Sequence, residues 1–248
     1  AANGETFTDV VRLEVPGEVC ETVSAVAEPL PPTVLFQMDT SNSMNCRADD
    51  FGCLTDDPTP APDDSRWDVF VSALVEAVGS FSDASSVGLM RFPRAEGACA
   101  RDEFVSDFTL LSDGRAGVVA AARSIVPDGL STPTHDAVAF GVGRLSGVER
   151  PALVLATDGD ARVCFGCDTD CAFDDPSAQD RDNDALVERV RAAAAAGVPT
   201  FVIGVPGSAG YRPVLSRLAS AAGTARAGCS DSGPTYCHYD LTDPALDF

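Results

Sequence analysis

Residues 36–43 of this chain read FQMDTSNS, the end of a short apolar segment followed by the pattern Asp-x-Ser-x-Ser. The segment 32–38 has the length and composition of a buried parallel strand. It brings the carboxylate of Asp39 and the hydroxyls of Ser41 and Ser43 into the loop at its C-terminal end. Oxygen ligands of this kind suit a hard divalent cation such as Mg²⁺. The same residue types are also favoured in polar turns, so this pattern alone does not establish a metal site.

Two later motifs are placed so that they complete such a site. Residues 131–137 read STPTHDA and open a helical stretch, and residues 151–159 read PALVLATDG, a buried-strand pattern that ends in Thr-Asp-Gly. In their order and spacing, the three motifs resemble the von Willebrand factor type A domain and its metal-ion-dependent adhesion site. The resemblance covers roughly residues 32–242 of the chain.

The resemblance implies a set of five metal ligands, carried over position by position: Asp39, Ser41, Ser43, Thr132 and Asp158. In the family, the serines and often the threonine bind the cation directly, the aspartates bind mostly through water, and a carboxylate of the partner protein takes the last coordination place. The implied cation is Mg²⁺, with Mn²⁺ and Ca²⁺ as alternatives. Thr134 and Ser131 compete with Thr132 for the role of ligand, and either threonine is also a candidate helix cap.

Two residues beside these ligands carry expectations of their own. Asn42 stands where the family loop commonly has glycine, and because Asn tolerates unusual backbone angles we expect the loop to form. His135 follows the threonine motif and is expected next to the implied cation, where contact with a ligand is one interpretation. We expect His135 on the solvent-facing side of its helix.

The remainder of the chain alternates strand patterns with helix patterns. Strands are expected at 32–39, 87–92, 104–111, 151–157, 199–205 and 236–241. Helices are expected at 67–81, 113–125, 134–146, 184–196 and 211–222, the first of them capped by Asp64 or Ser65. This alternation predicts an α/β fold: a Rossmann-like, doubly wound, mostly parallel sheet flanked by helices, as in the von Willebrand factor A fold. Ligands of such sheets bind where the parallel strands end, so topology brings the suspected ligands to one edge.

The expected domain organisation has two parts. Residues 1–31 form an N-terminal extension, in which an added strand within 7–15 is one interpretation, and residues 32–248 form the von Willebrand factor A domain. Two long polar insertions, near 44–64 and 161–183, leave the same edge of the sheet as the site. Loops in such positions commonly carry specificity.

Composition excludes several classes of partner and chemistry. The net charge is −21, which disfavours nucleic acid and anionic membrane surfaces as partners. All 17 basic residues are arginine, so lysine-dependent chemistry such as a P-loop or a Schiff base is excluded. No apolar run approaches the ~18 residues of a membrane span. The chain starts at Ala1 without a signal peptide, and any export signal is expected to have been removed or to lie outside this sequence.

Nine cysteines in hydrophilic loops predict disulfides and an oxidising compartment, so the protein is expected to be secreted, periplasmic or on the cell surface. In a parallel sheet, loops after strands lie on the metal-site edge and loops before strands lie on the opposite edge. This rule sorts the cysteines into six on the metal-site edge and three on the far edge. The first set is Cys46, Cys53, Cys99, Cys164, Cys167 and Cys171, and the second is Cys20, Cys229 and Cys237. Pairing within each set is expected, because a disulfide needs Cα atoms within about 7 Å.

The sequence therefore predicts an extracellular, adhesion-type binding module and not an enzyme. It is expected to capture an Asp or Glu of a partner protein through a divalent cation, without inserting into a membrane. One alternative is a hydrolase that uses the cation to activate water, although the sequence offers no nucleophile–base pair for it. Another alternative is a structural exported domain with a vestigial metal site.

Overall fold

The structure, a computed structural model, describes residues 30–50, 53, 63–93, 103–129, 132–159 and 176–243. The chain divides into two units, Ala1–Leu30 and Pro31–Phe248. All helices and strands described below belong to the second unit. The strand considered within 7–15 and the cysteines at 20, 99, 164, 167 and 171 lie outside the described residues.

A six-stranded sheet forms the centre of the second unit, with the strand order β3-β2-β1-β4-β5-β6. Its strands are β1 (Thr33–Asp39), β2 (Ser86–Phe92), β3 (Glu103–Leu110), β4 (Pro151–Thr157), β5 (Thr200–Gly204) and β6 (Tyr239–Asp240). All neighbouring pairs are parallel except β2 and β3, which run antiparallel at one edge. The α/β fold class expected from the sequence is confirmed.

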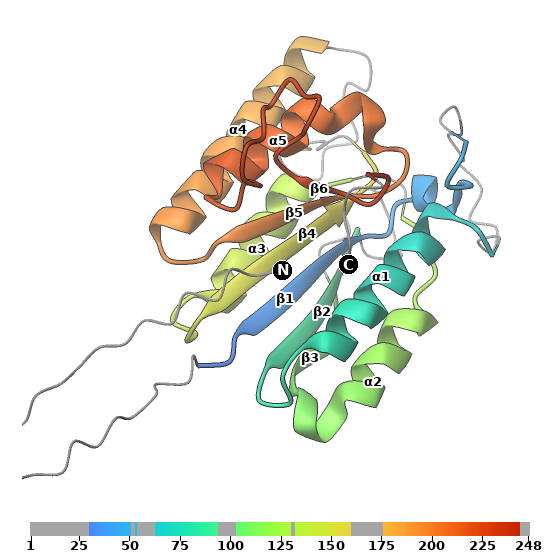
Figure 1. Ribbon diagram of the computed structural model, residues 1–248, viewed down its shortest axis with the longest axis vertical. Coiled ribbons are helices and arrows are strands. Elements are labelled where there is room, and N and C mark those ends of the chain that lie inside the picture. Colours follow the sequence, from blue (N-terminus) through green and yellow to red (C-terminus); the bar gives the residue numbers. More distant parts are fainter. Residues whose placement is uncertain are drawn as a thin grey trace, which may run out of the picture. The chain divides into compact units, whose positions relative to one another are not determined.

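Helices cover both faces of this sheet (Figure 1). They are α1 (Arg66–Ser80), α2 (Leu111–Ser124), α3 (Thr134–Leu145), α4 (Pro176–Ala195) and α5 (Arg212–Ala221), with short 3-10 turns η1 (Asn42–Asn45) and η2 (Ser208–Tyr211). Helices α1 and α2 pack on one face, and α3, α4 and α5 pack on the other. None of the helices in the described ranges combines the length and the apolar character that a membrane crossing requires.

The central strands are apolar on both sides because both of their faces are covered. In β1, Leu35 packs into the core beneath α3, α4 and α5, while its neighbour Phe36 packs into the core beneath α1 and α2. Successive side chains of a strand point to opposite faces, so a strand buried on both faces reads as a continuous apolar run. Each fully buried side chain of this size contributes about 1.5–3 kcal/mol.

The order of the strands creates a topological switch point between β1 and β4. From β1 the chain proceeds outward to β2 on one side, and from β4 it proceeds outward to β5 on the other side. The loops that leave these two strands therefore diverge at the position where the strands end. Ligands of doubly wound sheets bind at this position.

Two element boundaries differ from the sequence-based expectation by more than two residues. Helix α4 begins at Pro176, well before the expected start at residue 184, so the expected insertion 161–183 ends in helix. The early turns of α4 escaped prediction because Asp180 and Arg181 are exposed and show no apolar periodicity. Strand β6 is only two residues long, because the N–H of Cys237 donates to the hydroxyl of Ser216 and not to a neighbouring strand.

Two disulfides are present in the described part of the chain, Cys46–Cys53 and Cys229–Cys237. Each bridge joins cysteines of the same predicted set, so the sorting by sheet edge is confirmed for these four residues. The first bridge closes the segment after η1. The second bridge lies immediately before β6.

Candidate metal centre

Asp39 is the last residue of β1 and is fully buried. One carboxylate oxygen, Oδ1, accepts a hydrogen bond of 2.9 Å from the backbone N–H of Ser41. The other, Oδ2, accepts a hydrogen bond of 2.6 Å from the hydroxyl of Thr157, the last residue of β4. Both bonds favour the ionised form of the carboxylate and so oppose part of the pKa increase that burial causes. The carboxylate is thereby fixed between the two strands of the switch point.

The hydroxyls of the loop after β1 continue this arrangement toward Asp158. The Oγ atoms of Ser41 and Ser43 lie 3.0 Å apart. The hydroxyl of Ser43 donates to Oδ1 of Asp158 at 3.0 Å. Four of the five implied ligands, Asp39, Ser41, Ser43 and Asp158, are thus joined by a continuous chain of hydrogen bonds at the predicted edge of the sheet.

Gly129 holds the loop after β1 in place. It forms a parallel bridge with Ser41, in which the N–H of Asn42 donates to the carbonyl oxygen of Gly129 at 2.8 Å. A Cβ atom at position 129 would lie 2.2 Å from the ring of Pro93, so only glycine fits there. Asn42 adopts no left-handed backbone, since Arg150 is the one non-glycine residue with positive φ in the described ranges. The loop therefore forms with asparagine, as a 3-10 turn.

Arg66, which the sequence interpretation did not include, reaches the same site from the start of α1. Its Nη1 lies 2.6 Å from Oδ2 of Asp158, and the two side chains are only 5% and 2% exposed. Helix α1 is anchored there because Ser65 caps it with a reciprocal hydrogen bond to Asp68 and because the N–H of Arg66 donates to the carbonyl oxygen of Cys46. A cation at the first position of a helix opposes the helix dipole. An arginine in this unfavourable place is a sequence signal for a specific acidic partner, here Asp158.

The site holds more negative than positive charge. Burial raises the pKa of Asp39 to about 7, and the charge of Asp158 adds to this shift. Burial also raises the pKa of Asp158, although the hydrogen bond and the charge of Arg66 oppose that shift. The guanidinium of Arg66 pairs with Asp158 and not with Asp39, so the cluster of two carboxylates favours an additional positive charge, either a proton or a metal ion.

The two threonines at the start of α3 occupy different places. Thr134 is buried, and both its N–H and its hydroxyl donate to the carbonyl oxygen of Thr132. Thr132 is half-buried, and no hydrogen bond joins its side chain to the other four implied ligands. Ser131 lies outside the described residues. The hydroxyl of Thr132 is therefore not part of the hydrogen-bonded cluster that joins the other four implied ligands.

His135 does not face solvent, so that expectation was wrong. Its residue is 7% exposed, because α4 packs against α3 and covers it. Nδ1 lies 3.2 Å from Asp136, and Nε2 lies 3.5 Å from the guanidinium of Arg189 in α4. The polar residues at the start of α3 do not predict the contact with Arg189, because α4 is distant in sequence.

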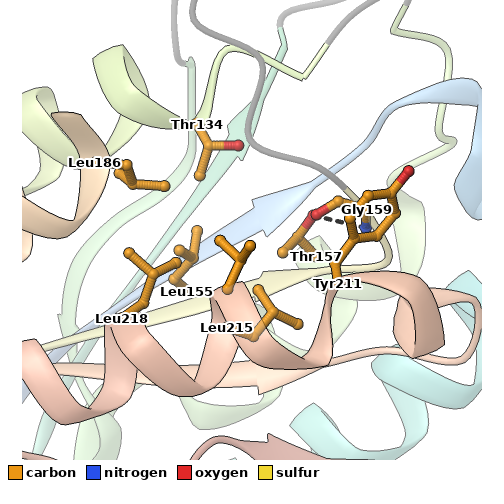
Figure 2. A pocket seen from close by; sticks show the side chains of 9 residues that line it. Thr134, Leu155, Thr157, Gly159, Leu186, Tyr211, Leu215 and Leu218 are labelled. Atoms are coloured by element: carbon orange, nitrogen blue, oxygen red, sulfur yellow. Dashed lines mark hydrogen bonds between the residues drawn. The ribbon is translucent and has the colours of Figure 1, made fainter. Parts of the chain in front are cut away.

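A small cavity adjoins the site behind Thr157 (Figure 2). Its volume is about 10 Å³, and its walls are mainly apolar side chains of β4, α4 and α5. Figure 2 shows Tyr211 closing one end beside Gly159, whose N–H donates to Thr157. A cavity of this size holds at most one water molecule. It offers no room for an organic substrate.

The donor set determines which cations are suitable. Within the described ranges, no group of three His, Cys, Asp or Glu residues has the arrangement of a metal site. The cluster at β1 and β4 instead combines two carboxylates with serine hydroxyls. Hard oxygen donors of this kind suit Mg²⁺ or Mn²⁺ and are poorly suited to soft metals. The residues present therefore fit the cation that the resemblance implies.

Comparison with known proteins supports the fold. No protein-family model matches the chain, and no curated protein matches it in sequence. Among solved structures, a point mutant of the PilB minor pilin from Streptococcus sanguinis is similar, with a TM-score of 0.59, 16% identity, and coverage of 86% of this chain and 57% of PilB. A von Willebrand factor type A protein from Catenulispora acidiphila overlaps with a TM-score of 0.43 and 15% identity, over 78% of this chain and 43% of that one.

Manganese-loaded TRAP protein of Plasmodium vivax overlaps with a TM-score of 0.49 and 11% identity, over 86% of this chain and 69% of that one. Of the PilB structure, this chain spans a little over half of the length. Strand order, the parallel core and the antiparallel edge strand give this chain the von Willebrand factor A-like fold that its sequence motifs imply. At these identities the likeness concerns the fold alone.

Proposed function

We propose that this chain is an extracellular protein-binding module of the adhesion type, and that a divalent cation at the β1–β4 edge captures a carboxylate of its partner. Asp39, Ser41, Ser43 and Asp158 would hold the cation, and Thr132 would complete the set from the start of α3. Mg²⁺ is the proposed resident ion, with Mn²⁺ or Ca²⁺ as alternatives. The proposal is for binding, not for catalysis.

One observation carries this proposal: two buried carboxylates lie in a cluster lined by serine hydroxyls, and only one of them pairs with a guanidinium. The carboxylates of Asp39 and Asp158 are connected through the serines, and one guanidinium cannot neutralise both. A buried charge without a counter-charge costs several kcal/mol. A divalent cation held there would remove that cost, and the neutral hydroxyls would leave it electrophilic.

The chemistry that the cation supplies is attraction of an anionic oxygen. With a net charge of −21, the protein repels acidic partners at long range, so a bound cation would give this edge local affinity for an Asp or Glu side chain. The cavity behind Thr157, at about 10 Å³, is too small to hold a small-molecule ligand beside the cation.

The proposed location is the cell surface or the extracellular space. The two described disulfides support it, because such bridges persist in oxidising compartments. The minor pilin whose fold is similar is consistent with a protein partner. The partner itself is defined here only by the carboxylate that it would present.

Calorimetric titration of the purified chain with Mg²⁺ and with Mn²⁺ tests the metal site. We expect one bound ion per chain, and a pull-down from native surface material should recover a partner with the metal present and lose it in chelator. A matched control is Asp240→Asn, which changes another buried carboxylate at the same edge of the sheet. Absence of metal binding by the wild-type chain would contradict the proposal.

A further inference from the structure

Arg66 is enclosed beside the candidate metal centre. Its Nη1 lies 2.6 Å from Oδ2 of Asp158 and 3.4 Å from the carbonyl oxygen of Ser43. Its Nη2 donates to the carbonyl oxygen of Asp50 at 2.7 Å. Gly207 forms a further wall, since a Cβ atom there would lie 2.5 Å from Cζ of Arg66. The protein therefore has a built place for this guanidinium, directly against a residue that we assign to the cation.

The position of Arg66 makes it a second positive charge at a site proposed for a cation. In the metal-free protein, Arg66 pairs with Asp158, one of the two buried carboxylates, and leaves Asp39 without a guanidinium. A divalent cation held by Asp158 would lie close to this guanidinium, and the two positive groups would repel each other in a poorly solvated environment. The guanidinium would thus stabilise the protein without metal and oppose the binding of a metal ion.

We propose that Arg66 is a built-in counterion that takes the place of the cation at Asp158 and competes with it. This inference rests on the proposed function, because competition requires that a cation binds at this centre. Arg66 is a positioning residue: it acts on the cation through Asp158. The occupancy of the site then depends on the metal concentration, because the ion has to offset the favourable Arg66–Asp158 pair.

A purely structural role for Arg66 makes a different prediction. In that case the ion pair would only fasten α1 to the loop after β4, and its loss would lower stability without improving metal binding. Arg212 provides the matched comparison. Its Nε lies 2.6 Å from Oδ2 of Asp240, the same separation, in a cluster that we do not assign to a metal.

The test compares Arg66→Met, Arg66→Lys and Arg212→Met with the wild-type chain. Mn²⁺ binding is measured by calorimetry, and thermal unfolding is measured in chelator and in saturating Mn²⁺. We expect Arg66→Met to bind Mn²⁺ about tenfold more tightly or better, because the competing charge is gone. Arg66→Lys keeps the charge and should stay within about threefold of wild type. Both methionine variants should melt earlier in chelator, but only Arg66→Met should recover in Mn²⁺ by more than wild type does.

The outcomes separate this inference from the proposed function. Equal or weaker Mn²⁺ binding by Arg66→Met, with normal binding by wild type, overturns the inference and leaves the metal site standing. If Arg66→Met binds Mn²⁺ and the wild-type chain does not, the inference is supported and the proposed metal binding by the wild-type chain is overturned. Binding by neither overturns both.

Poor folding of the variant does not remove the test. If Arg66→Met does not fold in chelator, it is refolded with Mn²⁺, and recovery supports the inference because the ion then replaces the guanidinium. Arg66→Gln is treated in the same way. Failure of both neutral variants to fold in Mn²⁺ overturns the inference.

Discussion

Two clusters at the same edge of the sheet pair a buried aspartate with an arginine, and they differ in charge balance. Asp158 follows β4 and pairs with Arg66, while Asp240 ends β6 and pairs with Arg212. Asp240 accepts its remaining hydrogen bonds from the N–H and the hydroxyl of Thr242, so one carboxylate faces one guanidinium. The Asp158 cluster contains a second carboxylate and two serine hydroxyls. Two similar ion pairs thus have different surroundings. The second carboxylate, Asp39, which has no guanidinium partner, distinguishes the candidate binding site from the structural pair.

The clusters are also alike in having a short disulfide nearby, which makes the comparison testable. Cys46–Cys53 spans seven positions in sequence and lies next to the loop of η1. Cys229–Cys237 spans eight positions and lies next to β6. Changes made in one cluster therefore have a close counterpart in the other, and the counterpart serves as the control for general loss of stability.

The largest expected effect comes from removing the excess charge with Asp39→Asn. Mn²⁺ binding should weaken by at least about 100-fold in calorimetry. In chelator, the variant should be more stable than wild type by about 2 kcal/mol or more in denaturant unfolding, because an ionised buried group with a raised pKa is removed. Asp240→Asn should instead lose about 1–3 kcal/mol, since it leaves the guanidinium of Arg212 without its charged partner. Loss of stability in both variants would break the distinction between the clusters.

Replacing each disulfide by two alanines should destabilise the protein by a similar amount, about 2–3 kcal/mol. Only the loss of Cys46–Cys53 should also affect the metal, because this bridge closes the segment that follows the ligand-bearing turn. We expect Mn²⁺ binding to weaken about threefold to tenfold, since the hydroxyls lose part of their preorganisation. Denaturant unfolding and calorimetry on both variants check this. An equal effect of the two bridges on metal affinity would show that the first one has no special relation to the site.

The clusters should respond to acid in opposite directions. The pKa of Asp39 is raised from 3.8 to about 7, so the folded, metal-free protein binds this proton more readily than the unfolded chain does. Its contribution makes the protein more stable as pH falls from about 7 toward 4. Burial lowers the pKa of His238, beside Asp240, from 6.5 to about 4, so its contribution makes the protein less stable over nearly the same range.

Comparing wild type with Asp39→Asn isolates the first contribution, because the contribution of His238 is common to both. The difference in unfolding free energy should shrink as pH falls from 7 to 4. Metal affinity of the wild type should fall by about tenfold for each pH unit below about 7, because the cation competes with the proton. A metal affinity that stays constant from about pH 7 down to about pH 5 would contradict this account.

The smallest expected effect separates the two threonines at the start of α3. Thr132→Ala should weaken Mn²⁺ binding about threefold to tenfold and leave stability nearly unchanged, because its side chain makes no hydrogen bond to the cluster. Thr134→Val should cost about 1 kcal/mol of stability, since a buried hydroxyl loses its bond to Thr132, and should leave metal binding unchanged. The reverse pattern would transfer the proposed ligand role to Thr134.

Topology made much of the site predictable from sequence. Asp39 and Asp158 end apolar segments, and parallel strands place the ends of such segments at one edge of a sheet. The serines follow Asp39 within the same loop, so their place was implied as soon as the strand was recognised. Both described disulfides obey the same rule about sheet edges.

The remaining features depend on side-chain reach and on packing between distant segments. Arg66 enters the site because Ser65 caps α1 and fixes the direction of its first residue, which the apolar periodicity of the helix does not reveal. The hydrogen bond from Thr157 to Asp39 requires the register of β1 against β4. His135 is buried by Arg189 and α4, and nothing in its local sequence announces that contact.

The edges of the sheet have a consequence for self-association. At one edge, β3 is irregular, with two shifts of register against β2, and its Asp107 turns back to bond the N–H of Phe108. At the other edge, β6 offers only two residues in the described part of the chain. Broken or very short borders are poor templates for another strand. Crowded copies of this protein should therefore resist stacking through their backbones, which leaves association to contacts that side chains and ions make selectively.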